Sequence, residues 1–197
     1  MRRGASLYRT GDRFTSLYAV RSGFFKATAV LENGREQVTG FSMTGEVLGM
    51  DGIGPEQHSC NVSAVEDSDI CVISFAALQA LAQQSPGLQH QLRKMMSREI
   101  VREHGVMLLL GSMNADERLA MFLLNLSRRF AAHGASPSEF NLRLTREEIG
   151  SYLGLKLETI SRTLSKFQQE GLIRVKLKFI RILDDAGLER VMRRDPD

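Results

Sequence analysis

The N-terminal part of the chain alternates short apolar runs with turn-forming residues. Between Ser6 and Phe75, the apolar runs include Leu17–Val20 and Phe24–Val30. Strands of about five residues between glycine-containing turns are typical of an all-β sandwich or barrel, and Asn33-Gly34 is the strongest hairpin signal in the chain. The pattern therefore predicts a β-domain over residues 1–83. Its turn signals are Thr10–Asp12, Arg21–Gly23, Glu32–Gly34 and Thr44–Glu46.

After Phe75 the spacing of apolar residues changes to three and four, which is the period of an α-helix. A short helix is predicted over Ala76–Gln83, and Ser85-Pro86 interrupts the pattern after it. The following segment, residues 84–114, is predicted to hold one long helix.

One set of positions along this long helix recurs at alternating spacings of four and three, the repeat of a two-stranded coiled coil. Because a carboxylate on an apolar seam costs stability unless it is solvated or partnered, Glu103 is expected to make dimerisation conditional. The alternative is a single helix packed on its own β-domain, and Gly105 weakens the coiled coil. The seam positions are Met96, Ile100, Glu103, Met107 and Leu110.

The last segment, residues 115–197, is predicted to be a separate helical domain. Met113–Asp116 ends the long helix and caps the next one, and His133–Pro137 forms a loop after that helix. The charged tail Arg190–Asp197 is expected to fray. The apolar inner face of the first helix comprises Leu119, Phe122, Leu123, Leu126 and Phe130.

Within Leu144–Phe167 the pattern predicts two short helices joined by a tight turn. Thr145 followed three residues later by Glu148 forms a capping box that begins the first helix, and Gly154 ends it. A second helix begins near Leu157. Two short helices at an angle across a glycine turn describe a helix-turn-helix. The second helix buries Ile160, Leu164 and Phe167.

The opposite face of the second helix carries side chains that suit recognition of base pairs. Arg162 has the two donors that match guanine O6 and N7, Glu158 accepts from cytosine N4, and Ser161 bonds either kind of edge. The alternative is an ordinary amphipathic helix pair whose polar face is only solvated.

Leu172–Leu183 alternates apolar and basic residues, a pattern that predicts a β-hairpin. A basic hairpin behind a recognition helix makes a winged helix whose wing lies along the DNA backbone. The apolar positions are Ile173, Val175, Leu177, Phe179 and Ile182, and the basic positions are Arg174, Lys176, Lys178 and Arg181.

The net charge of +3 is concentrated near the C-terminus. Residues 1–114 hold 11 basic and 11 acidic side chains, and residues 115–197 hold 15 and 12. Asn141–Ile182 alone has nine basic against four acidic, as expected of a surface that faces phosphates. A solvated basic face is the simpler alternative.

The remaining composition excludes several classes of protein. No apolar run approaches the ~20 residues of a membrane span, and the N-terminus has no signal-peptide core, so we expect a cytoplasmic protein. Cys60 and Cys71 are too few for a disulfide framework or a zinc site, and both are expected to be buried thiols. An enzyme of the cupin type would need two or three ligand histidines, whereas the β-region has only His58.

The run I-G-x-Y-L-G-L-x-x-E-T-I-S-R, Ile149–Arg162, resembles the DNA-binding helices of the CRP/FNR family of bacterial transcription regulators, and specifically its FNR branch. The β-region runs S-L-Y-A-V-R-S-G, G-x-E-Q-V-T-G-F and G-E-V-L-G-M-D-G-I-G resemble the family's sensor domain, so the resemblance covers nearly the whole chain. It implies an α+β fold with an N-terminal double-stranded β-helix (β-roll or jelly roll), a long dimerisation helix and a C-terminal winged helix-turn-helix.

The resemblance also implies function: a homodimer on a palindromic TTGAT-type site, controlling anaerobic or redox-responsive genes with RNA polymerase as partner. Two positions depart from the family's pattern. Lys156 stands where the reading helix often has a Ser or Thr cap, and Leu177 stands where the wing tip often has Gly. The implied DNA-binding residues are Glu158, Ser161, Arg162, Thr159, Lys156, Arg146, Lys166, Lys176 and Lys178.

The resemblance carries two expectations about the sensor. Cyclic-nucleotide-binding relatives have an Arg-Ser pair where this chain has His58-Ser59-Cys60, so Gly45-Glu46 is interpreted as a structural turn and cyclic AMP is not expected to bind. Cys71 matches the internal ligand of the FNR four-iron four-sulfur cluster, whose other three cysteines would lie upstream of Met1. The chain as given is therefore expected to bind no cluster, as a truncated form or a relative without oxygen sensing. The alternative function is a small-ligand-binding β-roll regulator or module with a cyclic-nucleotide-like or cupin-like site.

Overall fold

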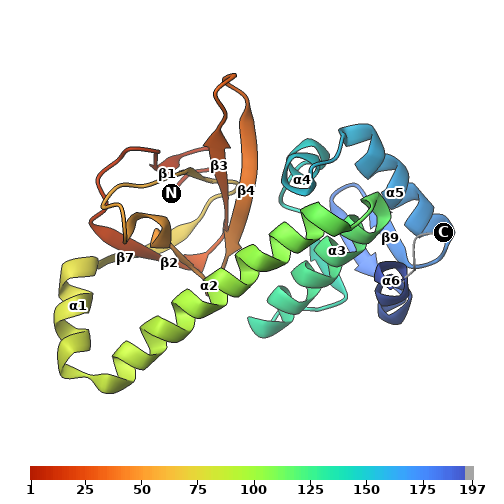
Figure 1. The fold of residues 1–197 in the computed structure, drawn as a ribbon. Helices are drawn as coiled ribbons and strands as arrows, with labels where there is room; N and C mark the ends of the chain where they lie inside the picture. The colour runs from red at the N-terminus through yellow and green to blue at the C-terminus, as the bar shows by residue number, and fades with distance from the viewer. Residues whose placement is uncertain (194–197) are drawn as a thin grey trace. The chain divides into compact units, whose positions relative to one another are not determined.

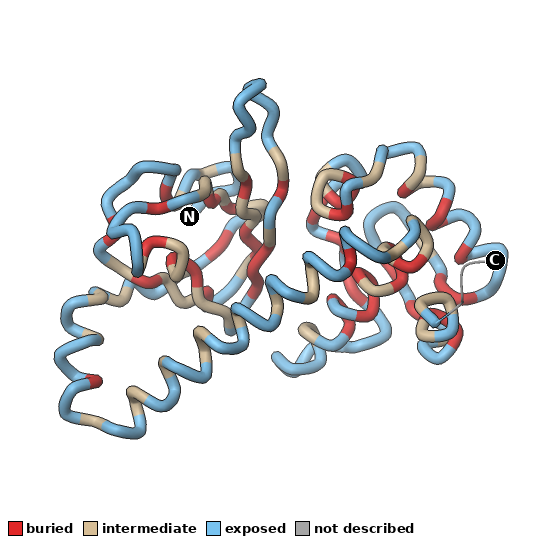
Figure 2. The backbone as a smooth tube through the Cα atoms, viewed as in Figure 1, coloured by how far each residue is buried: buried red, intermediate tan, exposed pale blue. Residues whose placement is uncertain are grey.

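The computed structural model describes residues 1–193. Its contacts divide the chain into two compact units, Met1–Gly105 and Val106–Asp197. Buried residues, drawn in red in Figure 2, gather inside each unit, so each has a hydrophobic core of its own. Among the described helices none is both long and apolar enough to cross a membrane.

The first unit contains two antiparallel sheets. One has the strand order β1-β6-β3-β4 and the other β5-β2-β7. Their inward side chains form a core around Phe25, which is fully buried. The predicted all-β domain is confirmed. The strands are β1 (Ser6–Tyr8), β2 (Ser16–Ser22), β3 (Phe24–Val30), β4 (Glu36–Met43), β5 (Val47–Leu48), β6 (Asn61–Ala64) and β7 (Asp69–Ser74), with a 3-10 turn, η1 (Met50–Gly52), after β5.

The turns predicted from glycine lie where the strands reverse. Gly23, between β2 and β3, has φ of 102°, and a Cβ there would lie 2.0 Å from the Ser68 hydroxyl oxygen, so no other residue fits without rearrangement. Asn33-Gly34 lies in the loop of the β3–β4 hairpin, which extends beyond the other strands in Figure 1. This hairpin, the strongest local signal in the sequence, is confirmed.

The two helices that follow the β-roll also match their predicted positions. α1 (Phe75–Gln84) begins at Ser74, whose hydroxyl accepts from the backbone N–H of Ala77. α2 (Pro86–Ser112) is continuous to the residue before Met113. It exposes large apolar side chains, Ile100, Val101, Met107 and Leu108, each more than half accessible.

The second unit is a winged helix-turn-helix with two elements that the sequence pattern did not reveal. β8 (Glu139–Asn141) pairs with β10, so the wing is a sheet of order β8-β10-β9 rather than a hairpin alone. The other elements are α3 (Ala115–Ala132), α4 (Arg146–Leu153), α5 (Leu157–Gln169), β9 (Ile173–Lys176), β10 (Phe179–Ile182) and α6 (Asp185–Met192).

The expectation that the chain frays from Arg190 onward is wrong for the residues up to Met192. Asp184 caps α6 by accepting from the Gly187 N–H at 2.8 Å, and Leu188 is fully buried. α6 contacts α3 (Figure 1), and Arg128 on α3 pairs with Glu189 at 3.0 Å. A cap at its start and the burial of Leu188 therefore stabilise this short helix. Residues 194–197 lie outside the described part of the chain.

Candidate nucleic-acid interface

The turn between α4 and α5 is built on two glycines. The Thr145 hydroxyl accepts from Glu148 N–H at 3.1 Å and the Glu148 carboxylate accepts from Thr145 N–H at 2.7 Å, so the predicted capping box begins α4. Gly154 ends α4 at φ of 64°. Gly150 lets the turn approach, because Leu155 N–H donates to its carbonyl at 2.8 Å and a Cβ at Gly150 would lie 2.6 Å from Leu155 O.

Two side chains of α3 hold this motif in place, and no local sequence pattern predicts either contact. Arg118 donates from Nη1 to the carbonyl of Leu153 at 2.9 Å and from Nε to that of Met113 at 2.8 Å. Asp116 accepts from the buried Thr163 hydroxyl of α5 at 3.1 Å. The angle of α5 is therefore fixed by contacts between residues far apart in sequence.

The outer face of α5 presents the predicted reading residues. Ile160, Leu164 and Phe167 are buried beneath it, as predicted. Glu158 and Arg162 are exposed, and neither side chain has a hydrogen bond or ion pair within residues 1–193. Their polar groups are therefore available to an external partner.

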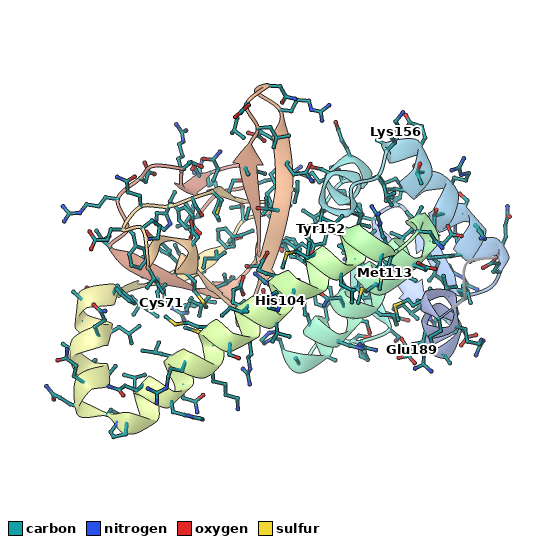
Figure 3. The ribbon with its side chains drawn as sticks, viewed as in Figure 1. Cys71, His104, Met113, Tyr152, Lys156 and Glu189 are labelled. Atoms are coloured by element: carbon teal, nitrogen blue, oxygen red, sulfur yellow. The ribbon has the colours of Figure 1, made fainter. Side chains whose placement is uncertain are left out.

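The other predicted residues of the α4–α5 region differ in how far they are engaged. Ser161 accepts a hydrogen bond from Arg146 Nη1 at 3.1 Å, so these two predicted DNA-binding residues contact each other in this structure. Lys166 is ion-paired with Asp116, and Thr159 is half-buried. Lys156, at the start of α5 (Figure 3), is exposed and provides no side-chain cap.

The wing adds cations beside α5. Lys176 and Lys178, at its tip, are exposed and form no ion pair within the described residues, whereas Arg181 pairs with Glu139 at 3.1 Å. Gln168 of α5 accepts from the N–H of Val175 at 2.9 Å, which ties the wing to the reading helix. Unpaired cations therefore lie on both elements that can face phosphates.

Comparison with known proteins identifies the family. The family model described as Crp-like helix-turn-helix domain matches residues 117–191, and that described as cyclic nucleotide-binding domain matches residues 1–85. The transcriptional regulatory protein btr of Bordetella pertussis is 45% identical over 190 residues, covering 96% of this chain and 78% of that protein. This chain belongs to the CRP/FNR family of transcription regulators.

Other CRP/FNR proteins support the same assignment. The fumarate and nitrate reduction regulatory protein of Escherichia coli K12 is 45% identical over 191 residues, covering 97% of this chain and 76% of that protein. The solved structure of FixK2 from Bradyrhizobium japonicum superposes with a TM-score of 0.89 at 28% identity, covering 96% of this chain and 93% of that chain. This CRP/FNR chain is a helix-turn-helix DNA-binding regulator and not an enzyme.

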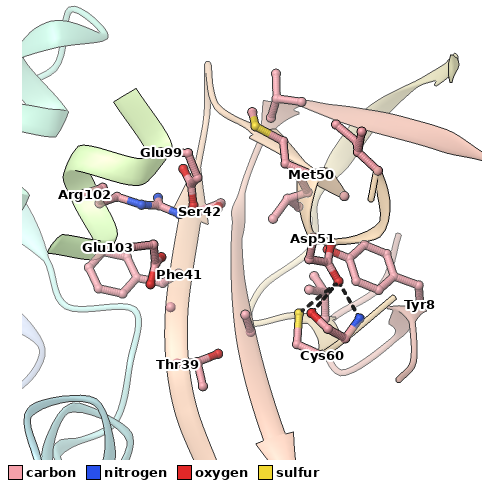
Figure 4. A pocket seen from close by; sticks show the side chains of 18 of the residues that line it. Tyr8, Thr39, Phe41, Ser42, Met50, Asp51, Cys60, Glu99, Arg102 and Glu103 are labelled. Atoms are coloured by element: carbon pink, nitrogen blue, oxygen red, sulfur yellow. Dashed lines mark hydrogen bonds and ion pairs between the residues drawn. The ribbon is translucent and has the colours of Figure 1, made fainter. Parts of the chain in front are cut away.

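The first unit of this CRP/FNR regulator contains a cavity of about 550 Å³ between the β-roll and α2 (Figure 4). Its walls are largely apolar. Three lining residues carry carboxylates: Asp51, Glu99 and Glu103. Arg102 is the one basic lining residue, and it is ion-paired with Glu99. The cavity is therefore more acidic than basic.

Asp51 is the centre of a hydrogen-bonded cluster in the cavity wall. It accepts from the Tyr8 hydroxyl at 3.2 Å and from the Ser59 N–H at 2.8 Å, and its other contacts are His58 Nδ1 at 3.3 Å and Cys60 Sγ at 3.6 Å. The Tyr8 and His58 rings stack with centroids 3.6 Å apart. Burial, and then the Asp51 charge, raise the pKa of Tyr8 well above its ordinary value.

The Gly45-Glu46 motif forms a turn between β4 and β5. Gly45 has φ of 88°, and the Glu46 carboxylate accepts from the Met43 N–H at 3.0 Å. Glu46 thus satisfies a backbone donor of its own turn, which agrees with its interpretation as a structural residue.

The predicted seam residues of α2 do not share one environment. Met96, Ile100 and Glu103 line the cavity wall, and Ile100 is also 57% exposed. Burial raises the pKa of Glu103, and the positive charge of Arg102 offsets part of this increase. In the second unit, Met107 is 62% exposed and Leu110 lies close to Gly154, at the helix-turn-helix turn.

The expectation that both cysteines are buried thiols is wrong for Cys71. β7 is an edge strand of its sheet, and Cys71 is exposed on it (Figure 3). Cys60 is half-buried, and burial followed by the Asp51 charge raises its pKa to about 12. The alternation of apolar and polar residues along a strand does not show whether the outer face of that strand is covered by another part of the protein.

Proposed function

We propose that this regulator acts as a homodimer that reads a palindromic TTGAT-type site with the outer face of α5. The observation that carries the proposal is the pair Glu158 and Arg162, which are exposed on one face with no partner in the described chain. Arg can donate two hydrogen bonds to guanine and Glu can accept one from cytosine, so this pair can read base edges when the face enters a major groove.

Dimerisation through α2 is supported by its exposed apolar side chains. Ile100 and Met107, both predicted seam positions, are more than half exposed, and so are Val101 and Leu108. We therefore place the seam on Met96, Ile100, Glu103, Met107 and Leu110 and extend it to Val101 and Leu108. A two-fold axis would present two copies of α5 to major grooves about 34 Å apart.

The proposed division of labour follows the predicted boundaries: residues 1–83 as sensor, 84–114 as dimerisation helix and 115–197 as DNA-binding domain. Transcription regulation requires DNA and RNA polymerase, so we propose RNA polymerase as a partner and the bacterial cytoplasm as the site of action. The E. coli relative is named for the regulation of fumarate and nitrate reduction, which motivates anaerobic genes as targets.

We propose that binding of an iron–sulfur cluster would need cysteines in addition to Cys60 and Cys71. Cys71 is exposed and so available as one ligand, but Cys60 has a pKa near 12 and is bonded to Asp51. A four-iron cluster takes four thiolates. Anaerobic reconstitution of the chain as given should therefore yield no stoichiometric charge-transfer band; a brown chromophore that is lost in Cys71→Ala would contradict this.

A second candidate function, regulation by a small ligand, is favoured by the cavity. Its volume lies within the usual range for ligand pockets. Three carboxylates against one paired arginine oppose a cyclic phosphate, so equilibrium dialysis should retain no cyclic AMP. Retention of cyclic AMP would show that the charge argument is wrong.

The test of the leading function is a titration of a TTGAT-type palindrome and a scrambled duplex at fixed salt. Arg162→Ala should lose about 1–3 kcal/mol per half-site on the palindrome and little on the scrambled duplex. Lys178→Ala is the matched control, because a phosphate contact is lost equally on both duplexes. Equal losses for Arg162→Ala would show that Arg162 is not a base reader, and no preference by the unmodified protein would refute the function.

A further inference from the structure

The tip of the wing is a two-residue loop in an unusual conformation. Phe179 pairs with Lys176, so Leu177 and Lys178 alone connect β9 to β10. Leu177 has φ of 58°, and Lys178 does not have a positive φ. Hairpin loops with positive φ at only the first central residue are of the II′ type, which takes glycine there. A leucine at this position is strained by its Cβ.

Leu177 is also the most exposed large apolar side chain of the described residues, at 91% accessibility. It therefore contributes almost nothing to the core of its own unit. Strain and exposure both destabilise the free protein, and no contact of the Leu177 side chain offsets them. Backbone outliers of this kind are a physical reason to look for a role in binding.

The surroundings of Leu177 indicate the chemistry of its partner. Lys176 and Lys178 flank it, and neither forms an ion pair within the described chain. Phe179, the next apolar residue, is 37% exposed. An apolar tip between two lysines matches a DNA strand, whose phosphates alternate with the apolar edges of deoxyribose.

Two hydrogen bonds connect the wing to the rest of the second unit. Val175 N–H donates to Gln168 of α5 at 2.9 Å, and Leu142 N–H donates to the Lys178 carbonyl at 2.7 Å. Both elements belong to the same compact unit, so a duplex held by α5 lies beside the wing tip as well.

We propose that Leu177 is a DNA contact, packing against deoxyribose beside the half-site while Lys176 and Lys178 bind the adjacent phosphates. This rests on the proposed function, because it needs α5 in the groove. The contact adds affinity without charge, so it differs from the phosphate contacts that a basic wing makes. It also assigns a use to the strained leucine.

The experiment compares Leu177→Gly, Leu177→Met and Lys176→Ala on the TTGAT-type palindrome across a range of salt. Leu177→Gly should bind about fivefold more weakly per bound wing, the size expected for partly burying one leucine side chain. The slope of affinity against salt should stay unchanged, whereas Lys176→Ala should reduce it by about one unit. Leu177→Met should retain most of the affinity. Hydroxyl-radical footprinting should lose one patch of protected sugars per half-site in Leu177→Gly.

Glycine suits the turn, so Leu177→Gly should unfold at the same or higher denaturant concentration than the unmodified protein. Loss of affinity with an altered salt slope would assign the effect to displaced lysines and overturn the inference. Unchanged affinity and footprint for Leu177→Gly would overturn it as well. Failure of the proposed function is read separately, from the unmodified protein's ratio of palindrome to scrambled binding.

Discussion

The reading helix and the β-roll use polar side chains in opposite ways. On α5, Glu158 and Arg162 are exposed and bind nothing within the described chain. In the β-roll, Asp51 binds Tyr8, Ser59 and Cys60 within its own unit. The first arrangement leaves hydrogen-bonding capacity for an external partner, and the second uses it to hold the fold. Residue type alone does not distinguish a binding group from a structural one; the presence of an internal partner does.

The largest effect is expected from closing the helix-turn-helix turn with a side chain. Gly150→Val places a branched side chain where even a Cβ would lie 2.6 Å from Leu155 O. We expect a loss of about 3 kcal/mol in the free energy of unfolding of the second unit, with loss of DNA binding. Urea denaturation measures it. Gly111→Ala, on α2 with open space around it, is the control and should be neutral or slightly stabilising.

Substituting Asp51 and Glu158 tests the comparison directly. Asp51→Ala leaves the buried His58 and the Tyr8 hydroxyl without their acceptor, so it should cost about 2 kcal/mol of stability. Glu158→Ala should leave stability unchanged and reduce discrimination at a cytosine contact. Thermal unfolding and duplex titration are measured for both variants. If Glu158→Ala were the more destabilising of the two, the contrast between the regions would be wrong.

Glu103→Leu should strengthen self-association by about tenfold, because it replaces a desolvated carboxylate on the seam. The pKa of Glu103 is raised, so its contribution to stability is present at low pH and lost as pH rises through the raised value. In the single chain, the gain in the free energy of unfolding from Glu103→Leu should therefore be largest near neutral pH and shrink below the ordinary glutamate value of 4.5. Urea denaturation at neutral pH and below that value measures this gain, and sedimentation over a dilution series measures the dimer constant. An unchanged dimer constant would place Glu103 outside the seam.

The smallest perturbation is chemical labelling of the two thiols. Cys71 is exposed, whereas Cys60 is half-buried with a pKa raised to about 12. Because the thiolate is the reactive form, alkylation of Cys60 should be slow near neutral pH and accelerate about tenfold per pH unit up to that value. Mass spectrometry of iodoacetamide-treated folded protein gives the site of labelling. Comparable rates at both cysteines would show that Asp51 does not hold the Cys60 thiol.

The secondary structure of most of the chain could be predicted because its signals are local. The Thr145–Glu148 box lies within four residues, and the Asn33-Gly34 turn within two. α6 was missed because it is only eight residues long and lies in a charged C-terminal segment, and its buried Leu188 depends on the contact between α6 and α3. β8 was missed for a related reason: three residues become a strand only when β10 lies beside them.

The sequence by itself determined the family and the order of the elements other than β8 and α6. It also determined the face of α5 that carries Glu158, Ser161 and Arg162, because helical periodicity places residues three and four apart on one side. Only the tertiary structure decided which side chains are engaged. Lys166 is paired with Asp116, 50 residues earlier, while Lys176 and Lys178 are unpaired, and nothing in the local pattern separates them. Likewise the exposure of Cys71 depends on its position in an edge strand. Periodicity is a property of neighbouring residues, whereas pairing and burial depend on which distant segments the fold brings together.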